Sequence, residues 1–500
     1  MLLSVLLDGC GVRPLGAIGA DPEIAGVALD SRRVEPGGLF LAIRGLREDG
    51  AGFVDEAIRR GARAVLAASP RPAGVADHIG WVQVAEPRRA AAPLARECYG
   101  RPDEALDLVG VTGTNGKTTV TYLVEAIGRA AGRRCGRIGT LGYSIDGRGE
   151  PLERTTPEAP EVFRLLARMR ELAVDLVAME VSSHALALGR VDGARFAVGA
   201  FLNLGRDHLD FHRDTAAYLA AKASLIERLG PDRTAVLPAD TELGHDLARR
   251  TPARVLTFGR SPAASVRLID ERSGWDGGSA VLATPLGRLP VRTFLLGDYN
   301  LDNVAAAVAC AVALGLRAES IAAGVLALEG VPGRMEAVRC GQPFTVVVDY
   351  AHTAEALQRA LGWARGICSG RVLVVFGCGG SRSREKRPEM GRTAAELADL
   401  VFLTSDNPRD DEPERILDEI ARGVALVPGG PARCTREVER EAAIRAAIGR
   451  ARAGDVVLVA GKGHETVQVL ADRTRPFDDR AVARRALEEA GWSGDVGGRS

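Results

Sequence analysis

Lysine is rare in this 500-residue sequence, and its few positions point to chemistry. Of the 65 basic residues only four are lysines, and the rest are arginines. The two side chains are not interchangeable where a site needs a compact charge or an amine that can lose its proton. An ordinary surface position is the alternative for any single one. Each lysine is therefore a candidate functional residue: Lys117, Lys222, Lys386 and Lys462.

Lys117 stands in LVGVTGTNGKTT, residues 108–119, where a glycine-rich turn joins a strand-like run to a helical run. The amides of such a turn, the helix start and the lysine can surround phosphate groups, and the Thr118 hydroxyl can reach a magnesium ion. The strict G-x-x-x-x-G-K-[ST] pattern is incomplete, because its first glycine would fall at Val111. The order of strand, turn, G-K-T-T and helix still predicts a nucleotide phosphate site.

Polar side chains follow the next two strand-like runs, DLVAMEVSSHAL and NLGRDHLDFH. In open α/β sheets the carboxyl ends of strands face the ligand, so Glu180 is placed to hold magnesium beside the nucleotide. A helix cap by Ser182 or Ser183 is the structural alternative. Four of the seven histidines lie in such strand-end segments, which favours a site: His184, His208, His352 and His464.

The segment LTSDNPRDDEP, residues 403–413, combines a proline-stiffened backbone, one arginine and several carboxylates. A solvated turn beginning at Asp406 or Asn407 would explain it simply. Two other strand ends carry glycine-rich turns, VVFGCGGSRSREKRPEMGR with Lys386 and VVLVAGKGHET with Lys462. The first is not a dinucleotide fingerprint, because Arg382 stands where G-x-G-x-x-G needs its third glycine. A basic anion pocket fits it better.

Composition limits the class of protein. A formal net charge of zero argues against a nucleic-acid surface or a polybasic membrane patch, so small-molecule partners are expected. The opening MLLSVLLDGC lacks the features of a signal peptide, and no apolar run approaches the roughly 18 residues of a membrane span. The eight cysteines are scattered without a C-x-x-C pair, which favours reduced thiols. We expect a cytoplasmic protein without membrane insertion.

The elements that must position these residues alternate between strand and helix, which predicts an α/β protein with parallel sheets. Its length predicts two to four domains, and the pattern favours three. We predict a small N-terminal α/β domain at 1–103, a central P-loop ATPase domain with a parallel sheet at 104–331, and a C-terminal Rossmann-like domain at 332–500. Residues 330–338, GVPGRMEAV, are the expected connection between the last two.

Ten motifs occur in the order seen in one family: GTNGKTT, MEVSSHAL, NLGRDHLDFH, YLAAK, GDYNLDN, PGRME, VDYAHT, GCGGSRSREKRPEMG, SDNPR and AGKGHE. The chain thus resembles the Mur ligases, ATP-dependent amide ligases of peptidoglycan synthesis. The set is most similar to the member that adds meso-diaminopimelate to UDP-N-acetylmuramoyl-L-alanyl-D-glutamate. The resemblance implies an acyl phosphate intermediate, ATP as co-substrate, Mg²⁺ as cofactor, and a monomer.

The resemblance also implies roles for individual residues. Those expected to bind ATP are Gly113, Thr114, Asn115, Gly116, Lys117, Thr118, Thr119, Asn300, Asn303, Arg334 and Asp349. Magnesium would lie near Thr118, Glu180, His208 and a carbamylated Lys222; the catalytic set is Lys117, Lys222, Glu180 and His208. The UDP-linked substrate would meet Leu29, Ser31, the loop 46–48, Thr155, Thr156, Ser182 and Arg190. Diaminopimelate would meet Arg382, Asp406, Asn407, Pro408, Arg409, Gly461 and Glu465.

Three departures from the family pattern weaken individual contacts to the UDP-linked substrate: Leu188, Arg154, and the loop GLREDGAG, which lacks the histidine common in the nucleotide-contacting turn. Diaminopimelate carries one carboxylate more than lysine. Arg409 can take that carboxylate while Asp406, Asn407 and Glu465 take the neighbouring ammonium, so diaminopimelate is favoured over lysine. The alternatives are an L-lysine-adding enzyme, another Mur or folylpolyglutamate-type ligase, and, from a different class, a P-loop switch that hydrolyses nucleotide to change partners.

Overall fold

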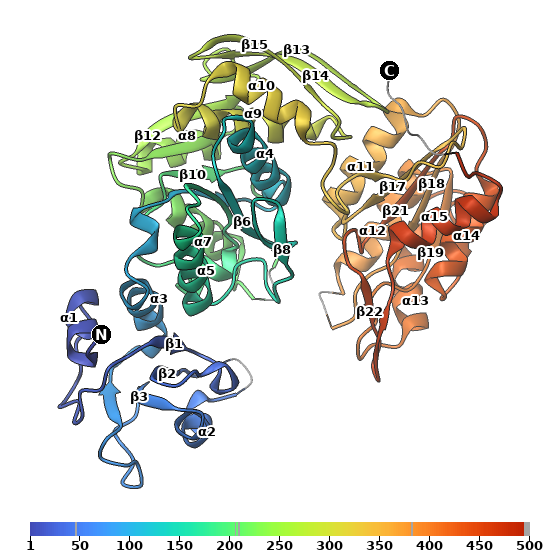
Figure 1. The fold of residues 1–500 in the computed structure, drawn as a ribbon. Coiled ribbons are helices and arrows are strands. Elements are labelled where there is room, and N and C mark those ends of the chain that lie inside the picture. Colours follow the sequence, from blue (N-terminus) through green and yellow to red (C-terminus); the bar gives the residue numbers. More distant parts are fainter. Residues whose placement is uncertain (46–47, 206, 209–210, 382–383, 495–500) are drawn as a thin grey trace.

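The computed structural model describes residues 1–45, 48–205, 207–208, 211–381 and 384–494 of the chain. Three sheets follow one another along the sequence, each with its own helices (Figure 1). The blue N-terminal unit lies below the green central unit, and the orange-red C-terminal unit lies beside the central one. The predicted α/β class with three units and mainly parallel sheets is confirmed.

The N-terminal unit is a four-stranded parallel sheet in the order β1-β2-β3-β4. Its strands are β1 (Gly26–Ala28), β2 (Gly38–Ala42), β3 (Ala62–Ala67) and β4 (Gly80–Gln83). Its helices are α1 (Leu3–Cys10), α2 (Val54–Arg59) and α3 (Pro87–Cys98), with 3-10 turns at Ser31–Arg33, Gly50–Phe53 and Pro102–Glu104. Leu39 and Leu41 pack towards α1 and α3, whereas Phe40 packs towards α2, so both faces of the sheet are covered.

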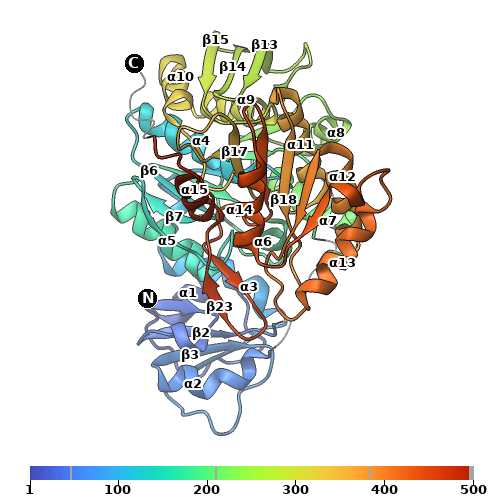
Figure 2. The same ribbon diagram turned by 90° about the vertical axis from the view of Figure 1, so that its right-hand side faces the viewer.

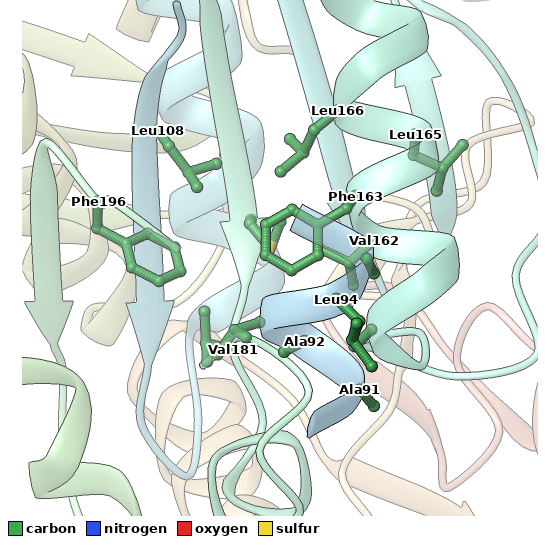
Figure 3. Close-up of a cluster of buried hydrophobic side chains, with 14 of the residues drawn as sticks. Ala91, Ala92, Leu94, Leu108, Val162, Phe163, Leu165, Leu166, Val181 and Phe196 are labelled. Carbon is green, nitrogen blue, oxygen red and sulfur yellow. The ribbon is translucent and has the colours of Figure 1, made fainter. Parts of the chain in front are cut away.

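Helix α3 joins this unit to the central one by packing against α5 (Ala159–Glu171). Ala92 and Leu94 of α3 lie beside Val162 and Phe163 of α5 in one apolar cluster (Figure 3). Arg33 adds ion pairs from the N-terminal unit to Glu153 and Glu161, each at 3.2 Å. The N-terminal sheet is therefore held at a fixed place against the central one.

The central sheet has eleven strands in the order β15-β14-β13-β12-β11-β10-β5-β9-β6-β7-β8. Its strands are β5 (Asp107–Thr112), β6 (Cys135–Gly139), β7 (Gly142–Ile145), β8 (Arg148–Glu150), β9 (Leu176–Glu180), β10 (Val198–Phe201), β11 (Thr234–Pro238), β12 (Arg254–Gly259), β13 (Val266–Gly274), β14 (Gly277–Thr284) and β15 (Gly287–Thr293). Its other helices are α4 (Lys117–Ala130), α6 (Ser183–Ala187), α7 (Thr215–Glu227), α8 (Glu242–Arg250), α9 (Tyr299–Ala313) and α10 (Ala318–Ala327).

The parallel core of this sheet is β13-β12-β11-β10-β5-β9-β6. Val109 and Val111 belong to a cluster with α4 and α9, whereas Leu108 belongs to the cluster with α5, because successive side chains alternate between the faces. Antiparallel strands extend both edges, β7-β8 at one and β14-β15 at the other. The sequence patterns predicted the parallel core but not these extensions.

The C-terminal sheet runs β16-β17-β21-β18-β19-β20, parallel except for β16. Its strands are β16 (Glu336–Ala337), β17 (Thr345–Asp349), β18 (Val372–Phe376), β19 (Leu400–Leu403), β20 (Cys434–Arg436) and β21 (Val456–Ala460), with a separate hairpin of β22 (Val467–Val469) and β23 (Thr474–Pro476). Its helices are α11 (Ala354–Ile367), α12 (Lys386–Leu397), α13 (Pro413–Val424), α14 (Arg440–Arg450) and α15 (Asp479–Glu489), with a 3-10 turn at Pro431–Arg433.

Helices cover both faces of this sheet, as the continuous apolar strands predict. Val374 and Phe376 pack with α11, α12 and α13, whereas Leu373 and Val375 pack with α14 and α15. Figure 2 shows α12 and α13 on one side and α14 and α15 on the other. All eight cysteines are free thiols. None of the helices in the described part of the chain has the length and apolarity that crossing a bilayer demands.

Candidate active site

The glycine-rich loop predicted to bind phosphate leaves β5 and enters α4 within four residues. Gly116 has φ 88° and a Cβ there would lie 2.3 Å from Asn303 Oδ1, so only glycine fits this turn. Asn303 donates to Asn300 Oδ1 at 2.7 Å, which places both asparagines behind the loop. Lys117 Nζ folds back onto the carbonyls of Gly113 (2.7 Å) and Thr114 (2.9 Å). The loop is therefore shaped to present amides and an ammonium to an anion.

Glu180 lies at the end of β9, next to β5, and is fully buried. Its Oε2 accepts hydrogen bonds from the hydroxyls of Thr118 and Thr140, both at 3.0 Å, and its Oε1 accepts the Thr140 amide at 2.8 Å. A Cβ on Gly139 would lie 2.3 Å from that Oε1. The carboxylate is thus fixed in one orientation, and Thr140 is a member of the site that the sequence did not reveal.

Lys222, on α7, reaches the same loop from the opposite side. Its side chain is 1% exposed, and Nζ donates to the Gly113 carbonyl at 2.7 Å, so two lysines converge on one oxygen. Burial lowers the pKa of the Lys222 ammonium well below its usual value; Lys117 lowers it further and Asp207 opposes the shift. A neutral amine at this position is a nucleophile for CO₂, which is the chemistry that carbamylation requires.

His208 stands beside these lysines with φ 56°, a left-handed conformation. Its amide donates to Asp207 Oδ1 at 2.9 Å, and its ring lies edge-on to His184 with centroids 4.7 Å apart. Burial lowers the pKa of His208 to about 4, although Asp207 raises it. The imidazole is therefore neutral at physiological pH and can act as an acceptor or a ligand.

Arg334 brings the connection between the second and third units into the nucleotide site. Its Nη2 donates to Thr118 Oγ1 at 3.3 Å, and its guanidinium lies 4.5 Å from the centre of the Tyr350 ring. Asp349 accepts the Met335 amide at 2.8 Å, and burial raises the pKa of Asp349 although Arg334 opposes the shift. These contacts place both predicted residues, Arg334 and Asp349, at the connection.

The residues predicted for the sugar-peptide part of the substrate form one network with Glu180. Thr156 Oγ1 donates to the Glu180 carbonyl at 2.8 Å, Arg190 donates to the Thr156 carbonyl at 2.9 Å, and Thr155 shares a hydrogen bond with Thr140 at 3.0 Å. Ser182 caps α6 through the Ala185 amide at 3.2 Å, which confirms the capping alternative without excluding a second role.

The predicted uridine contacts lie in the N-terminal unit. Ser31 donates to Glu56 Oε2 at 2.7 Å, and Leu29 packs against the core that the first two units share. Arg33, in the same 3-10 turn as Ser31, makes the ion pairs that reach the central unit. Both predicted residues therefore stand beside the junction of two units. Within the predicted loop 46–48, residues 46–47 lie outside the described residues.

The residues predicted to bind the amino-acid substrate lie at the ends of β19 and β21. The Arg409 amide donates to the Val469 carbonyl (3.1 Å), and its Nη1 donates to the Gly380 carbonyl (2.8 Å). A Cβ on Gly461 would lie 2.5 Å from Asp406 Oδ2, so the two strand ends are in close contact. A Cβ on Gly380 would lie 1.7 Å from the Pro408 carbonyl, so this turn closes against the same loop. Arg382, predicted for the same ligand, lies outside the described residues.

Asn407 differs from the expectation that it would accept an ammonium. Its Oδ1 already accepts hydrogen bonds from Lys462 Nζ and the Val469 amide, both at 2.9 Å, and its Nδ2 donates to Glu465 Oε2 at 2.6 Å. The oxygen is used by the protein, so the side chain offers a donor to a ligand. The hairpin β22–β23, which supplies Val469, was not predicted.

The acidic tail of the DNPR segment has a structural use. Arg387 of α12 is fully buried and pairs with Asp411 and Glu419, both at 2.7 Å. Lys386, the preceding residue, donates to the His352 carbonyl at 3.0 Å. Asp411 therefore ties the segment after Arg409 to α12, and Glu419 ties α13 to the same arginine.

The donor set near the phosphate loop fits a magnesium ion. Mg²⁺ takes oxygen ligands and is commonly bound through one or two carboxylates together with substrate phosphates and water. The Thr118 hydroxyl and the Glu180 carboxylate are 3.0 Å apart beside the loop, and a carbamate at Lys222 would add oxygens. No group of three or more His, Cys, Asp or Glu occurs among the described residues, so a pure protein cage for a metal is not built there.

Three family descriptions match successive parts of the chain. They are the Mur ligase family catalytic domain at residues 23–99, the Mur ligase middle domain at 111–311, and the Mur ligase glutamate ligase domain at 333–463. Among similar proteins, the UDP-N-acetylmuramoyl-L-alanyl-D-glutamate–2,6-diaminopimelate ligase of Solibacter usitatus is 46% identical over 482 residues, covering 96% of this chain and 97% of its own. The protein of that name from Streptomyces avermitilis is 44% identical, covering 94% and 93%.

Solved structures of similar ligases share the fold over most of the chain. A structure with the same ligase name has a TM-score of 0.66 at 32% identity, covering 94% of this chain and 95% of the other. A MurF ligase of Thermotoga maritima in complex with ADP has a TM-score of 0.62 at 22% identity, covering 93% and 96%, which shows the shared fold. With its three units matched in order and relatives similar over nearly its whole length, the chain belongs to the Mur ligase family.

Proposed function

We propose that this protein is an ATP-dependent ligase that joins meso-diaminopimelate to the D-glutamate of UDP-N-acetylmuramoyl-L-alanyl-D-glutamate in peptidoglycan synthesis. The proposal rests on the polar surface that residues 406–409 and Glu465 form together. Arg409 and Asn407 offer donors there, while Asp406 and Glu465 offer carboxylates. Such a surface matches a group that carries both a carboxylate and an ammonium, as each end of diaminopimelate does.

The first chemical step is activation of a poor electrophile. The γ-phosphoryl group of ATP passes to a carboxylate oxygen of the D-glutamyl residue, ADP leaves, and an acyl phosphate forms. The protein contributes positioning and charge neutralisation. The amides of the loop and the Lys117 ammonium hold the phosphates, while Asn300, Asn303, Arg334 and Asp349 enclose the nucleotide. Magnesium would lie at Thr118 and Glu180 with His208 nearby, where it neutralises charge on the transferring group.

Lys222 has a second function in this proposal. Its depressed pKa supplies the neutral amine that reacts with CO₂; the nitrogen loses one proton to solvent, and the resulting carbamate places a negative charge beside Lys117. A hard cation accepts the carbamate oxygens as ligands. The buried position, 1% exposed, limits access of protons from bulk water, which would release CO₂ from the carbamate.

The second step joins the amine. The amino group of diaminopimelate attacks the acyl carbon, phosphate leaves, and the new amide nitrogen loses a proton. The far end of the amino acid decides specificity. Arg409 and the Asn407 amide receive its carboxylate, and Asp406 and Glu465 receive its ammonium. Lysine would leave Arg409 without this partner, and sites built around such a contact reject the analogue by up to about 10⁴–10⁵-fold.

The proposal also covers the organisation of the chain. Residues 1–103, 104–331 and 332–500 are its three domains, and Leu29, Ser31, Thr155, Thr156, Ser182 and Arg190 contact the UDP-linked substrate. The free cysteines are consistent with a cytoplasmic location. The protein acts as a monomer.

An Arg409→Met variant tests the specificity argument. The expected wild-type product is the tripeptide, identified by a mass increase of one diaminopimelate less one water. The variant should lose most of this product, and its preference for diaminopimelate over L-lysine should fall by at least 100-fold. An unchanged preference would refute the role of Arg409, and equal wild-type use of both amino acids would favour the lysine-adding alternative.

A further inference from the structure

Lys462 occupies a place where a charge is costly, and the proposed reaction gives it no task. It follows β21 directly and its side chain is 0% exposed. Its ammonium donates three hydrogen bonds, to Asn407 Oδ1 (2.9 Å), Glu465 Oε2 (2.9 Å) and the Val467 carbonyl (2.7 Å). An ammonium has three donors, so this group is fully satisfied inside the protein and has none left for a ligand. Buried charges persist when they are paired in this way.

The first effect of Lys462 is on the amide of Asn407. The Val469 amide also donates to Asn407 Oδ1, at 2.9 Å. A lysine ammonium and a backbone amide can only donate, so the amide group of Asn407 is oriented in one way. Its NH₂ group gives one hydrogen to Glu465 Oε2 at 2.6 Å. Its other N–H makes no hydrogen bond to the described residues and is left for a ligand.

The second effect is on the carboxylate of Glu465. Its Oε2 accepts from both Asn407 and Lys462, which holds the group in one rotation. The side chain keeps 28% of its surface exposed, and its second oxygen, Oε1, accepts no hydrogen bond from the described residues, so it is the oxygen left for a ligand. Lys462 therefore fixes a donor, the Asn407 NH₂ group, beside an acceptor, the Glu465 carboxylate. Its own ammonium is buried and is used entirely by these and the Val467 carbonyl.

We propose that Lys462 is a positioning residue for the amino-acid substrate. It sets the polarity of the far end of the site, with Asn407 as donor to a carboxylate and Glu465 as acceptor for an ammonium, without touching the amino acid itself. This inference rests on the proposed ligase function. It assigns a task to the one fully buried lysine that the phosphate chemistry does not use.

A Lys462→Met variant tests the proposal, because methionine has similar length and no donor. The KM for diaminopimelate should rise at least tenfold, while kcat and the KM values for ATP and the UDP-linked dipeptide change less than threefold. Hydroxylamine provides a second readout, since it captures the acyl phosphate as a hydroxamate without using the amino-acid site. Hydroxamate formation should fall less than threefold. Arg473→Met, at the exposed tip of the same hairpin (67% exposed), is the control and should behave as wild type.

Coupling to Asn407 separates positioning from a general structural effect. In an Asn407→Leu background, Lys462→Met should raise the KM for diaminopimelate by a smaller factor than in the wild type, because one of the two groups that it orients is gone. A wild-type KM in Lys462→Met, fully multiplicative losses in the double variant, or parallel loss of hydroxamate would each overturn the proposal.

Folding of the variants is checked by circular dichroism. If Lys462→Met does not fold, Lys462→Leu, which also has no donor, is judged by the same criteria. Failure of both to fold would leave only a structural role and overturn the proposal. Failure of the ligase function itself looks different, since the wild type would then form no hydroxamate.

Discussion

Replacing Gly139 by alanine should disable the predicted phosphate site by displacing Glu180. Gly139 ends β6 beside Glu180, and an added Cβ would lie 2.3 Å from Glu180 Oε1 and 2.9 Å from its Cγ and Cδ. Ordinary contacts begin near 3.4 Å, so the carboxylate must move by about 1 Å. That movement breaks the hydrogen bonds from Thr140 and Thr118, which are 2.8–3.0 Å long.

The expected loss of kcat/KM for ATP is about 100-fold, since a displacement of this size at a positioned group has that effect. Overpacking should also lower the free energy of unfolding by about 1–3 kcal/mol. Rates are measured by phosphate release at a temperature where circular dichroism shows the variant folded.

Gly362→Ala is the matched control. This glycine lies on the exposed face of α11 with no atom within 4 Å of an added Cβ. Its activity should be unchanged, and its stability should rise by up to about 1 kcal/mol. A folded Gly139→Ala enzyme with kcat/KM within threefold of wild type would refute the assignment of Glu180.

Three further outcomes follow from the buried groups. Lys222→Ala should lower ligation about 10²–10³-fold and regain part of it with added acetate or formate; a fully active variant would exclude the carbamate. Arg440→Met breaks a fully buried pair with Asp479, two hydrogen bonds of 2.7 Å, and should lower the free energy of unfolding by about 3–5 kcal/mol in urea titrations; a change below about 1 kcal/mol would contradict this. Burial lowers the pKa of His464 to about 3, so between pH 6.5 and 3 the unfolded chain binds a proton that the folded protein does not. Stability should therefore fall as the pH drops through this window, by at most about 1.4 kcal/mol per unit, and His464→Gln should flatten the slope; equal slopes would show that His464 does not titrate in this way.

The strand ends that carry Glu180, His208 and Asp406 could be predicted from the sequence. Each follows an apolar run that is buried on both faces of a parallel sheet, and parallel strands bring their carboxyl ends to one edge. The same reasoning could not find Thr140. It follows β6, a strand whose Arg137 is buried because it pairs with Glu125 at 2.8 Å and lies 3.6 Å from the centre of the Tyr122 ring. A charged residue lowers the mean hydropathy of a short strand, so a search for apolar runs does not find it.

The direction of hydrogen bonding at Asn407 was equally beyond the sequence. An amide can donate or accept, and only the partners decide which. Here the partners are Lys462, from another strand end, and Val469, from the hairpin β22–β23. The acids after Arg409 pose the same difficulty, since the partner of Asp411 is Arg387 on a separate helix. Such assignments depend on tertiary contacts that spacing along the chain does not encode.

The central claim is that ATP turnover is coupled to one amino acid. Phosphate release is measured with purified protein, ATP, Mg²⁺ and UDP-N-acetylmuramoyl-L-alanyl-D-glutamate, in parallel reactions with meso-diaminopimelate, with L-lysine and with no amino acid. We predict sustained release only with meso-diaminopimelate, matched mole for mole by tripeptide. Release at the same rate in all three reactions would contradict the claim and favour a nucleotide switch.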